Sequence, residues 1–432
     1  MKYFGTDGIR GKALEKLSPE LAFRMGQSLK KVLNADMIVI GGDTRQSSDL
    51  LGYSIANGAM LAGIHVLYAG VVSTPMLAHY AKVKKIVGVM ITASHNPFTD
   101  NGIKTFYNEA KLDVEVETQI EAFIDSEEII KAPQYGTFQF TTDMDDIYLA
   151  LYDNINLKQT NLKIGYDSAN GANYKIAKKV FDLIAPDAIQ IGNTPDGLNI
   201  NKGVGSMHLE SIQSLVVREN LDLGFAFDGD ADRMNLVDQE KEYDGDFVVY
   251  MIGKYLKSKG MLPNNKVVLT KMSNPGMLKA LKEAGIEYVL TDVGDKYVLD
   301  AMKQENLVVG GEASGHIILT HLIHTGDGLL AAVYLLSILS ELKTTPKAYT
   351  REVTLYPLKT INIKNVDKAS AKNPKVLAAV KKAEALLGED YLLLLRPSGT
   401  EPVVRLTCSH KDEALVLSVM DDIKKVIEEV NQ

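Results

Sequence analysis

Short apolar runs alternate with longer amphipathic stretches from the start of the chain to about Thr354. The order strand, polar loop, helix, strand recurs in three segments, which begin at Met37, Leu162 and Lys266. Apolar, β-branched runs separated by helical stretches of about 10 to 15 residues are typical of right-handed βαβ units. The pattern therefore predicts an α/β protein with three similar α/β domains, each built on a mixed, mainly parallel sheet.

Each repeat also contains a second apolar strand, and this strand ends in an unusual polar loop. We predict these strands at residues 87–91, 223–227 and 307–309, followed by loops at 92–97, 228–233 and 310–316. In open α/β sheets, ligands lie beyond the carboxyl ends of the strands. The loops are therefore expected to surround one central cleft.

The pattern changes after Thr354. Strands are predicted at 359–363, 391–395 and 403–407, with helices at 374–387 and from Asp412 onward, which indicates a C-terminal α+β domain. A fourth polar loop, residues 396–402, joins its last two strands. The predicted domains are 1–143, 144–241, 242–355 and 356–432, with boundaries uncertain by several residues.

Composition narrows the class of protein. Hydrophobic residues make up 46% of the chain and charged residues 24%, as in globular proteins with a buried core. Forty-seven basic against fifty-five acidic residues give a net charge of -8, which argues against nucleic acid or an anionic membrane as a partner. The most apolar stretch, 328–340, is shorter than the roughly 20 residues that span a bilayer, so we predict a buried helix.

Cysteine usage and the first residues bear on location. The single cysteine, Cys408, has no partner for an intramolecular disulfide, which fits a reducing, cytoplasmic environment. The first ten residues contain no apolar segment of the kind found in signal peptides. We therefore expect a cytoplasmic protein.

Three carboxylates follow the strand at 223–227. Asp228, Asp230 and Asp232 lie within five residues, and their mutual repulsion is costly unless a cation offsets it. A calcium loop of the EF-hand type is excluded, because Arg233 and Gln239 occupy positions that need Gly and Glu. Mg²⁺ fits better than a merely solvated acidic turn, and Arg233 suits a phosphate ligand as well.

The loop at 92–97 contains Ser94 beside His95. No G-x-S-x-G motif surrounds this serine, so a hydrolase triad is poorly supported. Taken alone, Ser-His-Asn-Pro is more often a structural turn, in which Ser and Asn bond the backbone and Pro restricts φ.

The two remaining loops offer groups that bind phosphates and sugars. The loop 396–402 combines a guanidinium, two hydroxyls and the amide of Gly399, as a phosphate-binding nest does, although a simple turn is equally compatible. In the loop 310–316, Glu312 and Ser314 suit sugar hydroxyls and His316 could carry a proton.

Together with Gly5-Thr6-Asp7-Gly8-Ile9-Arg10, these loops resemble the α-D-phosphohexomutase superfamily over nearly the whole chain. Within it, five runs resemble the bacterial branch that isomerises glucosamine phosphates. These runs are Tyr3–Gly11, Asp100–Lys104, Met272–Asn274, Thr325–Gly328 and Gly399–Pro402.

The resemblance implies roles for matching residues. Ser94 would be the phosphoserine and a metal ligand, with Asp228, Asp230 and Asp232 holding one Mg²⁺. Glu312 and Ser314 would contact the sugar. The non-reacting phosphate would be held by Arg396, Ser398, Gly399, Thr400 and Arg405. Arg10, Lys104 and His316 would transfer protons or stabilise charge, with Arg233 and His95 close by.

The implied reaction interconverts glucosamine 6-phosphate and glucosamine 1-phosphate and supplies UDP-N-acetylglucosamine synthesis. It would run through a 1,6-bisphosphate, which also serves as primer, with hinge motion near residues 354–358. The phosphosugar is then the partner, without nucleic acid or membrane, and a homodimer is one possible assembly. Two positions depart from the family pattern: Ala231 replaces a glycine of the metal loop, and Gly42 stands where lysine is common.

Other readings stay open at this point. A phosphoglucomutase or phosphomannomutase of the same superfamily is the main alternative, because nothing in the sequence explains an amine at C2. A Mg²⁺-dependent phosphohydrolase using Asp228 and Asp230 would release inorganic phosphate. A silent phosphosugar-binding protein would bind ligand without exchange between positions 1 and 6.

Overall fold

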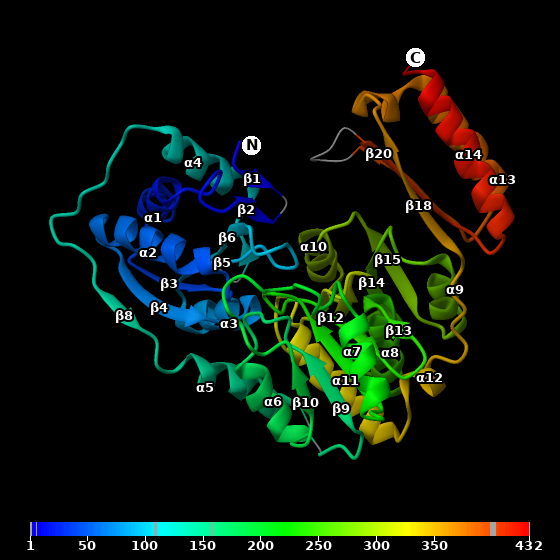
Figure 1. Cartoon of the computed structure of the whole chain (residues 1–432), viewed down its shortest axis with the longest axis horizontal. Helices are drawn as coiled ribbons and strands as arrows, with labels where there is room; N and C mark the ends of the chain where they lie inside the picture. The colour runs from blue at the N-terminus through cyan, green and yellow to red at the C-terminus, as the bar shows by residue number, and fades with distance from the viewer. Residues whose placement is uncertain are drawn as a thin grey trace.

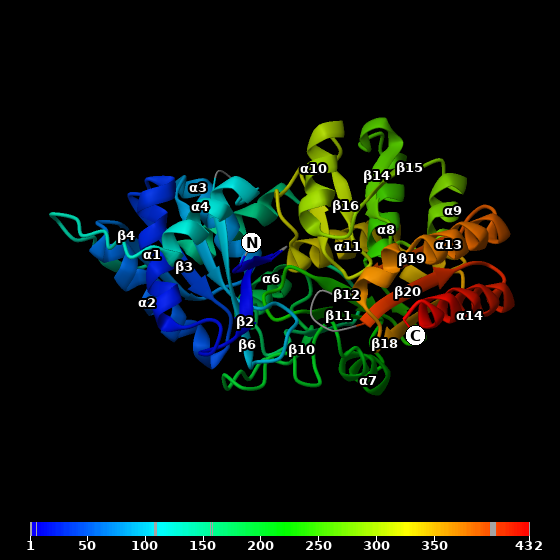
Figure 2. The same cartoon turned by 90° about the horizontal axis from the view of Figure 1, so that it is seen from above.

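The computed structural model describes residues 2–5, 7–107, 110–155, 157, 159–397 and 403–431. These residues form four sheets in chain order, and the units built on the first and last sheets lie at opposite ends, with the other two between them (Figures 1 and 2). Helices flank the sheets throughout. The predicted arrangement of three α/β domains and a C-terminal α+β domain is confirmed.

The first sheet runs in the order β1-β2-β6-β5-β3-β4-β8, with β7 paired to β6. Strands β4, β3 and β5 are parallel neighbours, so their carboxyl ends lie at one edge, whereas β6 is antiparallel to β5. The strands are β1 (Phe4–Gly5), β2 (Gly8–Lys12), β3 (Met37–Gly42), β4 (His65–Val71), β5 (Val87–Ile91), β6 (Asp100–Tyr107), β7 (Ala110–Lys111) and β8 (Phe138–Phe140). The helices are α1 (Pro19–Leu33), α2 (Gln46–Leu61), α3 (Thr74–Lys84) and α4 (Val114–Asp125).

The second and third sheets repeat a parallel pair at their centre. Their orders are β10-β9-β11-β12-β13 and β15-β14-β16-β17. The strands are β9 (Ile164–Asp167), β10 (Ile189–Ile191), β11 (Leu223–Phe227), β12 (Met234–Val237), β13 (Glu242–Tyr243), β14 (Lys266–Thr270), β15 (Glu287–Thr291), β16 (Val309–Gly311) and β17 (Ile317–Leu319). The helices are α5 (Met144–Leu149), α6 (Ile176–Ile184), α7 (Glu210–Arg218), α8 (Gly245–Ser258), α9 (Pro275–Glu283), α10 (Asp295–Glu305), α11 (Gly328–Leu342) and α12 (Pro346–Tyr349).

Helix α11 joins the second and third units. It begins after Asp327, whose carboxylate accepts the N–H of Leu330 at 3.0 Å, and most of its side chains are buried, as predicted. It packs against α8 of the third unit and against α6 and β12 of the second, so both units share one hydrophobic core. In the described part of the chain, no helix has the length and apolar character that crossing a bilayer requires.

The C-terminal unit is an antiparallel sheet in the order β18-β20-β19, with two helices beside it (Figure 1). The elements are β18 (Leu358–Lys364), β19 (Leu392–Pro397), β20 (Val403–Ser409), α13 (Pro374–Leu387) and α14 (Glu413–Glu429). Its apolar side chains form a cluster of their own, separate from the core of the other units. A unit with its own core is able to move as a rigid body.

One predicted strand is shifted. The strand expected at 307–309 is β16, Val309–Gly311, so Gly310 and Gly311 belong to the strand and not to the loop. The reason is close packing of α10, because a Cβ on Gly310 would lie 2.6 Å from Met302 Sδ. A glycine that signals a loop in sequence here permits a helix to approach a strand.

Helices α1 and α2 cross at two glycines. A Cβ on Gly58 would lie 2.0 Å from the Phe23 carbonyl oxygen, and one on Gly26 would lie 2.1 Å from that of Ile55. We expect Gly58→Ala to lower the free energy of unfolding by about 2 to 3 kcal/mol, because the helices must separate to admit the methyl. Chemical denaturation measures the change. In the control Gly253→Ala in α8, the added Cβ meets only side-chain atoms, at 3.0 and 3.9 Å, and the variant should lose little stability.

Candidate active site

Ser94 lies on the loop after β5 and points at the acidic loop of the second unit. Its Oγ donates a hydrogen bond to Asp228 Oδ2 at 2.5 Å, and His95 Nδ1 lies 3.3 Å away. The serine is 1% exposed and has a φ of 53°, in the left-handed region that non-glycine residues rarely occupy. Such strain persists only where the surrounding structure holds it, and it concentrates at functional sites.

Asp228, Asp230 and Asp232 follow β11, and all are buried. Each offers a carboxylate oxygen, and these oxygens lie within 4.8 Å of one another. Among the described residues, Oδ1 of Asp230 and of Asp232 have no hydrogen-bond donor although both atoms are buried. Buried carboxylate oxygens that lack a hydrogen-bond donor and lie close together suit a hard divalent cation.

The fourth residue of this loop, Ala231, adopts a φ of 59° and is buried. Glycine adopts such a conformation without cost, whereas an L-residue with a side chain is disfavoured there. The departure from the family pattern therefore strains the loop at this position, and the strain coincides with packing of the alanine methyl in the core.

Lys104 of β6 reaches the acidic loop from the first unit. Its Nζ donates to Asp230 Oδ2 at 2.8 Å and to Asp232 Oδ2 at 3.3 Å. Burial lowers the pKa of Lys104, but the neighbouring carboxylates outweigh burial and raise it well above its ordinary value. Burial raises the pKa of Asp232, and Lys104 and His316 hold it well below its usual range.

Alternating charges close a ring around the site. The ion pairs, in order around the ring, are Lys104–Asp7 (3.2 Å), Asp7–Lys111 (2.5 Å), Lys111–Asp295 (2.5 Å), Asp295–His316 (3.7 Å), His316–Asp232 (3.7 Å) and Asp232–Lys104 (3.3 Å). The members come from all three α/β units. Burial lowers the pKa of His316, but Asp232 and Asp295 outweigh this effect and raise it above its ordinary value.

A cavity of about 580 Å³ opens over this ring. Arg10, His95, Lys104, Arg233, Glu312 and His316 line it. Arg10 Nε, Arg233 Nε and His316 Nε2 are buried without a hydrogen-bond partner among the described residues. Burial and the two arginines lower the pKa of His95 to about 4, which leaves its imidazole neutral.

Glu312 and Ser314 take different positions. Glu312 is buried at the cavity wall, and its Oε1 accepts the N–H of Gly294 at 3.0 Å. Ser314 is exposed and does not line the cavity. The structure thus brings Glu312 and His316 to the site and leaves Ser314 beside it.

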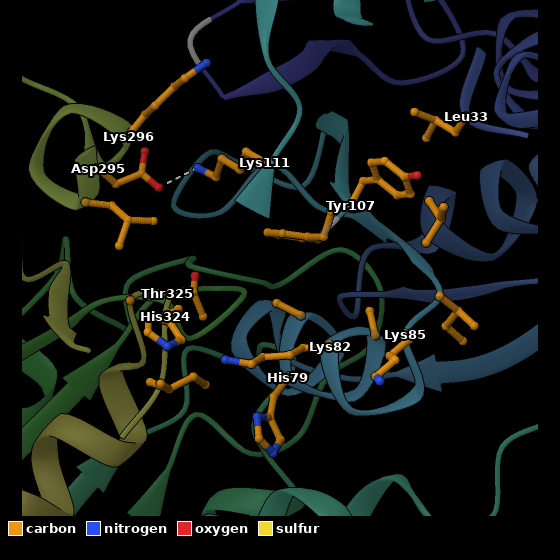
Figure 3. Close-up of a pocket in the computed structure, with 18 of the residues that line it drawn as sticks. Leu33, His79, Lys82, Lys85, Tyr107, Lys111, Asp295, Lys296, His324 and Thr325 are labelled. Carbon is orange, nitrogen blue, oxygen red and sulfur yellow. Dashed lines mark hydrogen bonds and ion pairs between the residues drawn. The ribbon is translucent and has the colours of Figure 1, made fainter. Parts of the chain in front are cut away.

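A second cavity of about 650 Å³ lies between the first and third units and shares Lys111, Asp295 and His316 with the first (Figure 3). Figure 3 shows the Lys111–Asp295 pair at its edge, with His79, Lys82 and Lys85 on the opposite side. Lys111 and Asp295 therefore line both cavities.

Two arginines predicted to bind the distal phosphate, Arg396 and Arg405, are held by other contacts. Arg396 Nη2 lies 3.4 Å from Met272 Sδ, and Arg405 Nε donates to Asn362 Oδ1 at 3.0 Å. Neither arginine lines the cavity. Ser398, Gly399 and Thr400 lie outside the described residues.

Sequence reasoning missed the members of the ring that carry no strong motif. Asp7 stands inside the opening motif Gly5–Arg10, which was the one signal for it. Lys111 and Asp295 lie in β7 and at the start of α10, where a charged residue is ordinarily a surface residue. Their role follows from the contact between two units, which local sequence does not encode.

Such a site suits the transfer of a phosphoryl group, a reaction whose catalysis rests on positioning and on neutralising charge. Comparison with known proteins supports this class. Four profiles of phosphoglucomutase/phosphomannomutase match the chain: alpha/beta/alpha domain I at residues 1–131, domain II at 146–242, domain III at 244–356 and the C-terminal domain at 360–426. The chain therefore belongs to the phosphoglucomutase/phosphomannomutase family, within the α-D-phosphohexomutase superfamily.

Individual relatives span the whole chain. The chain is 40% identical to phosphoglucosamine mutase of Carboxydothermus hydrogenoformans over 442 residues, covering 99% of this chain and 100% of that protein. It is 39% identical to the Streptococcus suis phosphoglucosamine mutase over 454 residues, covering 99% and 98%.

Solved structures share the fold. A phosphoglucomutase/phosphomannomutase family protein of Burkholderia thailandensis aligns with a TM-score of 0.82 at 21% identity, over 98% of this chain and 96% of that one. The Aspergillus fumigatus N-acetylphosphoglucosamine mutase, solved with GlcNAc-6P and magnesium, gives 0.70 at 16%, over 100% and 96%.

Proposed function

We propose that this protein interconverts glucosamine 6-phosphate and glucosamine 1-phosphate through a phosphoserine at Ser94 and a 1,6-bisphosphate intermediate. The observation that carries the proposal is the 2.5 Å hydrogen bond from Ser94 to Asp228, beside a cavity lined by cations. The relatives at about 40% identity are phosphoglucosamine mutases, which favours an amino sugar.

Asp228, Asp230 and Asp232, together with the phosphorylated Ser94, would hold one Mg²⁺. The ion would neutralise charge on the transferring phosphoryl oxygens. The unpartnered oxygens of Asp230 and Asp232 support this assignment. Lys104 and Thr74 bond the opposite oxygen of Asp230, at 2.8 and 2.6 Å, and so orient the carboxylate.

Transfer would begin with attack of the sugar 1-hydroxyl on the phosphorus of phosphoserine. The bond from phosphorus to Ser94 Oγ breaks, the sugar hydroxyl gives up a proton, and Oγ ends as a hydroxyl. Arg10, Lys104 and His316 line the cavity beside the serine loop. The pKa of Lys104 is raised well above its ordinary value, so its ammonium stays charged and we assign it to charge stabilisation, with Arg10 and His316 beside it.

The sugar would bind at both ends. Glu312, at the cavity wall, would accept hydrogen bonds from its hydroxyls, and Ser314, exposed beside the cavity, would be a second sugar contact. The distal phosphate would be bound by the fourth loop. Its members are Arg396, Ser398, Gly399, Thr400 and Arg405. After the first transfer, the bisphosphate turns around, and Ser94 takes up the phosphoryl group from position 6.

Because Arg396 and Arg405 stand outside the cavity, the cycle needs the C-terminal unit to close. Its separate core and the connection at residues 354–358 permit a rigid-body hinge. Asn274 bonds both the N–H and the carbonyl of Tyr356 at 2.9 Å, which ties one side of this hinge to the third unit. Closure would exclude water and favour transfer to sugar over hydrolysis.

We expect glucose 1,6-bisphosphate, used as a primer analogue, to reduce the radius of gyration measured by small-angle X-ray scattering. The physical reason is that a bisphosphate bridging the Ser94 loop and Arg396 draws the C-terminal unit toward the cavity. Arg396→Ala should bind the bisphosphate without full compaction. Identical scattering curves with and without bisphosphate in the wild-type protein contradict hinge closure.

The test of the proposed function compares kcat/KM for glucosamine, glucose and mannose 6-phosphates, each with a trace of the corresponding 1,6-bisphosphate. A clear preference for glucosamine 6-phosphate is the expected result. Preference for glucose or mannose would make the protein a phosphoglucomutase or phosphomannomutase. Stoichiometric release of inorganic phosphate would instead favour a phosphohydrolase, and binding without isomerisation would refute catalysis.

A further inference from the structure

A buried arginine holds the loop that carries Ser94. Arg45 precedes α2, and its side chain is 0% exposed. Its Nη2 donates to the carbonyl oxygens of Ser94 and Asn96, both at 2.9 Å, and its Nη1 donates to those of Asn96 and Pro97 at 3.1 and 2.9 Å. Three carbonyls of one tight loop therefore converge on a single guanidinium.

The other side of Arg45 is held by Asp43. Arg45 Nε donates to Asp43 Oδ2 at 3.0 Å, and that carboxylate is also 0% exposed. The same Oδ2 accepts the hydroxyl of Thr92 at 2.6 Å, and the Thr92 oxygen in turn accepts the N–H of Ser94 at 2.9 Å. The carbonyl oxygen of Ser94 thus bonds Arg45 directly, and the N–H of Ser94 is linked to Asp43 through the Thr92 hydroxyl.

The second unit adds a matching donor. Asn201 Nδ2 donates to the carbonyl oxygens of Ser94 at 2.8 Å and of Asn96 at 3.1 Å. Gly229, between two aspartates of the metal loop, lies so close that a Cβ on it would be 2.6 Å from the Ser94 oxygen. The serine loop and the acidic loop are therefore positioned against each other through the Ser94 carbonyl.

We propose that Arg45, supported by Asp43 and Asn201, is a positioning residue that holds Ser94 in its left-handed conformation and aims Oγ at the metal site. The inference rests on the proposed function of Ser94. Arg45 does not line the cavity, so we expect it to act on the reaction through the geometry of the serine. Each catalytic cycle has two phosphoryl transfers, one from Ser94 and one back to it, and both require the same position of Ser94 Oγ.

Lysine cannot replace this arrangement. A guanidinium presents its N–H donors in a planar fork, and Arg45 uses Nε, Nη1 and Nη2 toward four oxygens. An ammonium keeps the charge but directs three donors from one atom, so it cannot reach Asp43 and all three carbonyls together. The loop should then relax and move Oγ away from Asp228.

The first test is Arg45→Lys, with Arg24→Lys as the matched control. Arg24 of α1 also holds a loop of the first unit, through the carbonyls of Phe123 and Ser126 at 2.7 and 2.8 Å and that of Glu128, but it lies outside the site. We expect Arg45→Lys to lower kcat by about 100-fold, as a displacement near 1 Å does, with KM close to wild type. Arg24→Lys should keep both constants.

A second variant covers the case in which Arg45→Lys folds poorly. Asn201→Ala removes the donor from the other unit, and we expect a smaller fall in kcat with unchanged KM. In both variants, intact-protein mass spectrometry after mixing with glucose 1,6-bisphosphate should show slower phosphorylation of Ser94. Calorimetry should show unchanged binding of the same bisphosphate.

The outcomes separate the two proposals. If the wild-type protein fails to isomerise hexose phosphates, the proposed function and this inference both fail. If the wild type isomerises and Arg45→Lys keeps its kcat, or loses activity only in proportion to lost folded protein, the positioning role of Arg45 is refuted. A raised KM at unchanged kcat would refute it as well, because it would place Arg45 in substrate binding.

Discussion

Ser94→Ala is expected to lower kcat for interconversion of the glucosamine phosphates by about four to six orders of magnitude, as loss of a covalent nucleophile does in other enzymes. The variant has no oxygen to carry the phosphoryl group between positions 1 and 6. Substrate binding should persist, because the cavity that would hold the sugar is lined by other residues, including Arg10, Arg233 and Glu312. Coupled assays measure kcat, and calorimetry with glucosamine 6-phosphate measures binding.

The control is Ser28→Ala in α1. Ser28 is also fully buried, but its hydroxyl donates to the Met25 carbonyl within the helix, so the variant should keep wild-type turnover. Wild-type protein incubated with bisphosphate should gain the mass of one phosphate, which Ser94→Ala should not. Retained isomerase activity in Ser94→Ala would end the phosphoserine mechanism for this protein.

Asp228→Asn is expected to lower kcat by about 10³-fold or more while it stabilises the metal-free protein. Burial, with repulsion from Asp230 and Asp232, raises the pKa of Asp228 well above its ordinary value. The unfolded chain ionises this carboxyl at its usual pKa of about 4. Folded metal-free protein therefore loses stability as pH rises above that value, until the folded pKa is passed.

An asparagine removes this dependence, so at neutral pH we expect the metal-free variant to gain about 1 to 2 kcal/mol over the wild type. Thermal unfolding in the presence of chelator measures the gain, and added Mg²⁺ should stabilise the wild type but not the variant. In the control Asp182→Asn, an exposed carboxylate paired with Lys178 is lost, and the Mg²⁺ response should remain. A wild-type protein with no Mg²⁺ response contradicts the assignment.

Much of the fold could be predicted from local sequence. The strands predicted at 87–91 and 223–227 coincide with β5 and β11, and the helix predicted at 374–387 coincides with α13. These segments have uniform apolar runs or clear helix limits, such as Pro374 after the capping residue Asn373. The strand β16 was misplaced because its glycines serve packing against α10, which depends on a neighbour and not on the segment itself.

Some residues of the candidate site could likewise be predicted from the sequence, and others could not. Ser94, the three aspartates, Glu312 and His316 were chosen from loops next to apolar strands, and Arg10 and Lys104 from the family resemblance. The structure gathers these residues around one region. Lys111, Asp295 and Arg45 were not, since a single charged residue carries no local signal of burial. Their partners come from other units or distant loops, so their significance follows only from three-dimensional contact.

The order of apolar strands and polar loops by itself determined the three repeated α/β units, the C-terminal unit and the chemistry that each loop presents, because these depend on neighbours in sequence. Only the tertiary structure decided that Ser94 has a left-handed backbone clamped by a buried arginine, that six alternating charges close a ring across three units, and that Arg396 stands outside the cavity. Those features arise where distant loops or separate units meet, and packing and desolvation at such contacts depend on residues that lie far apart along the chain.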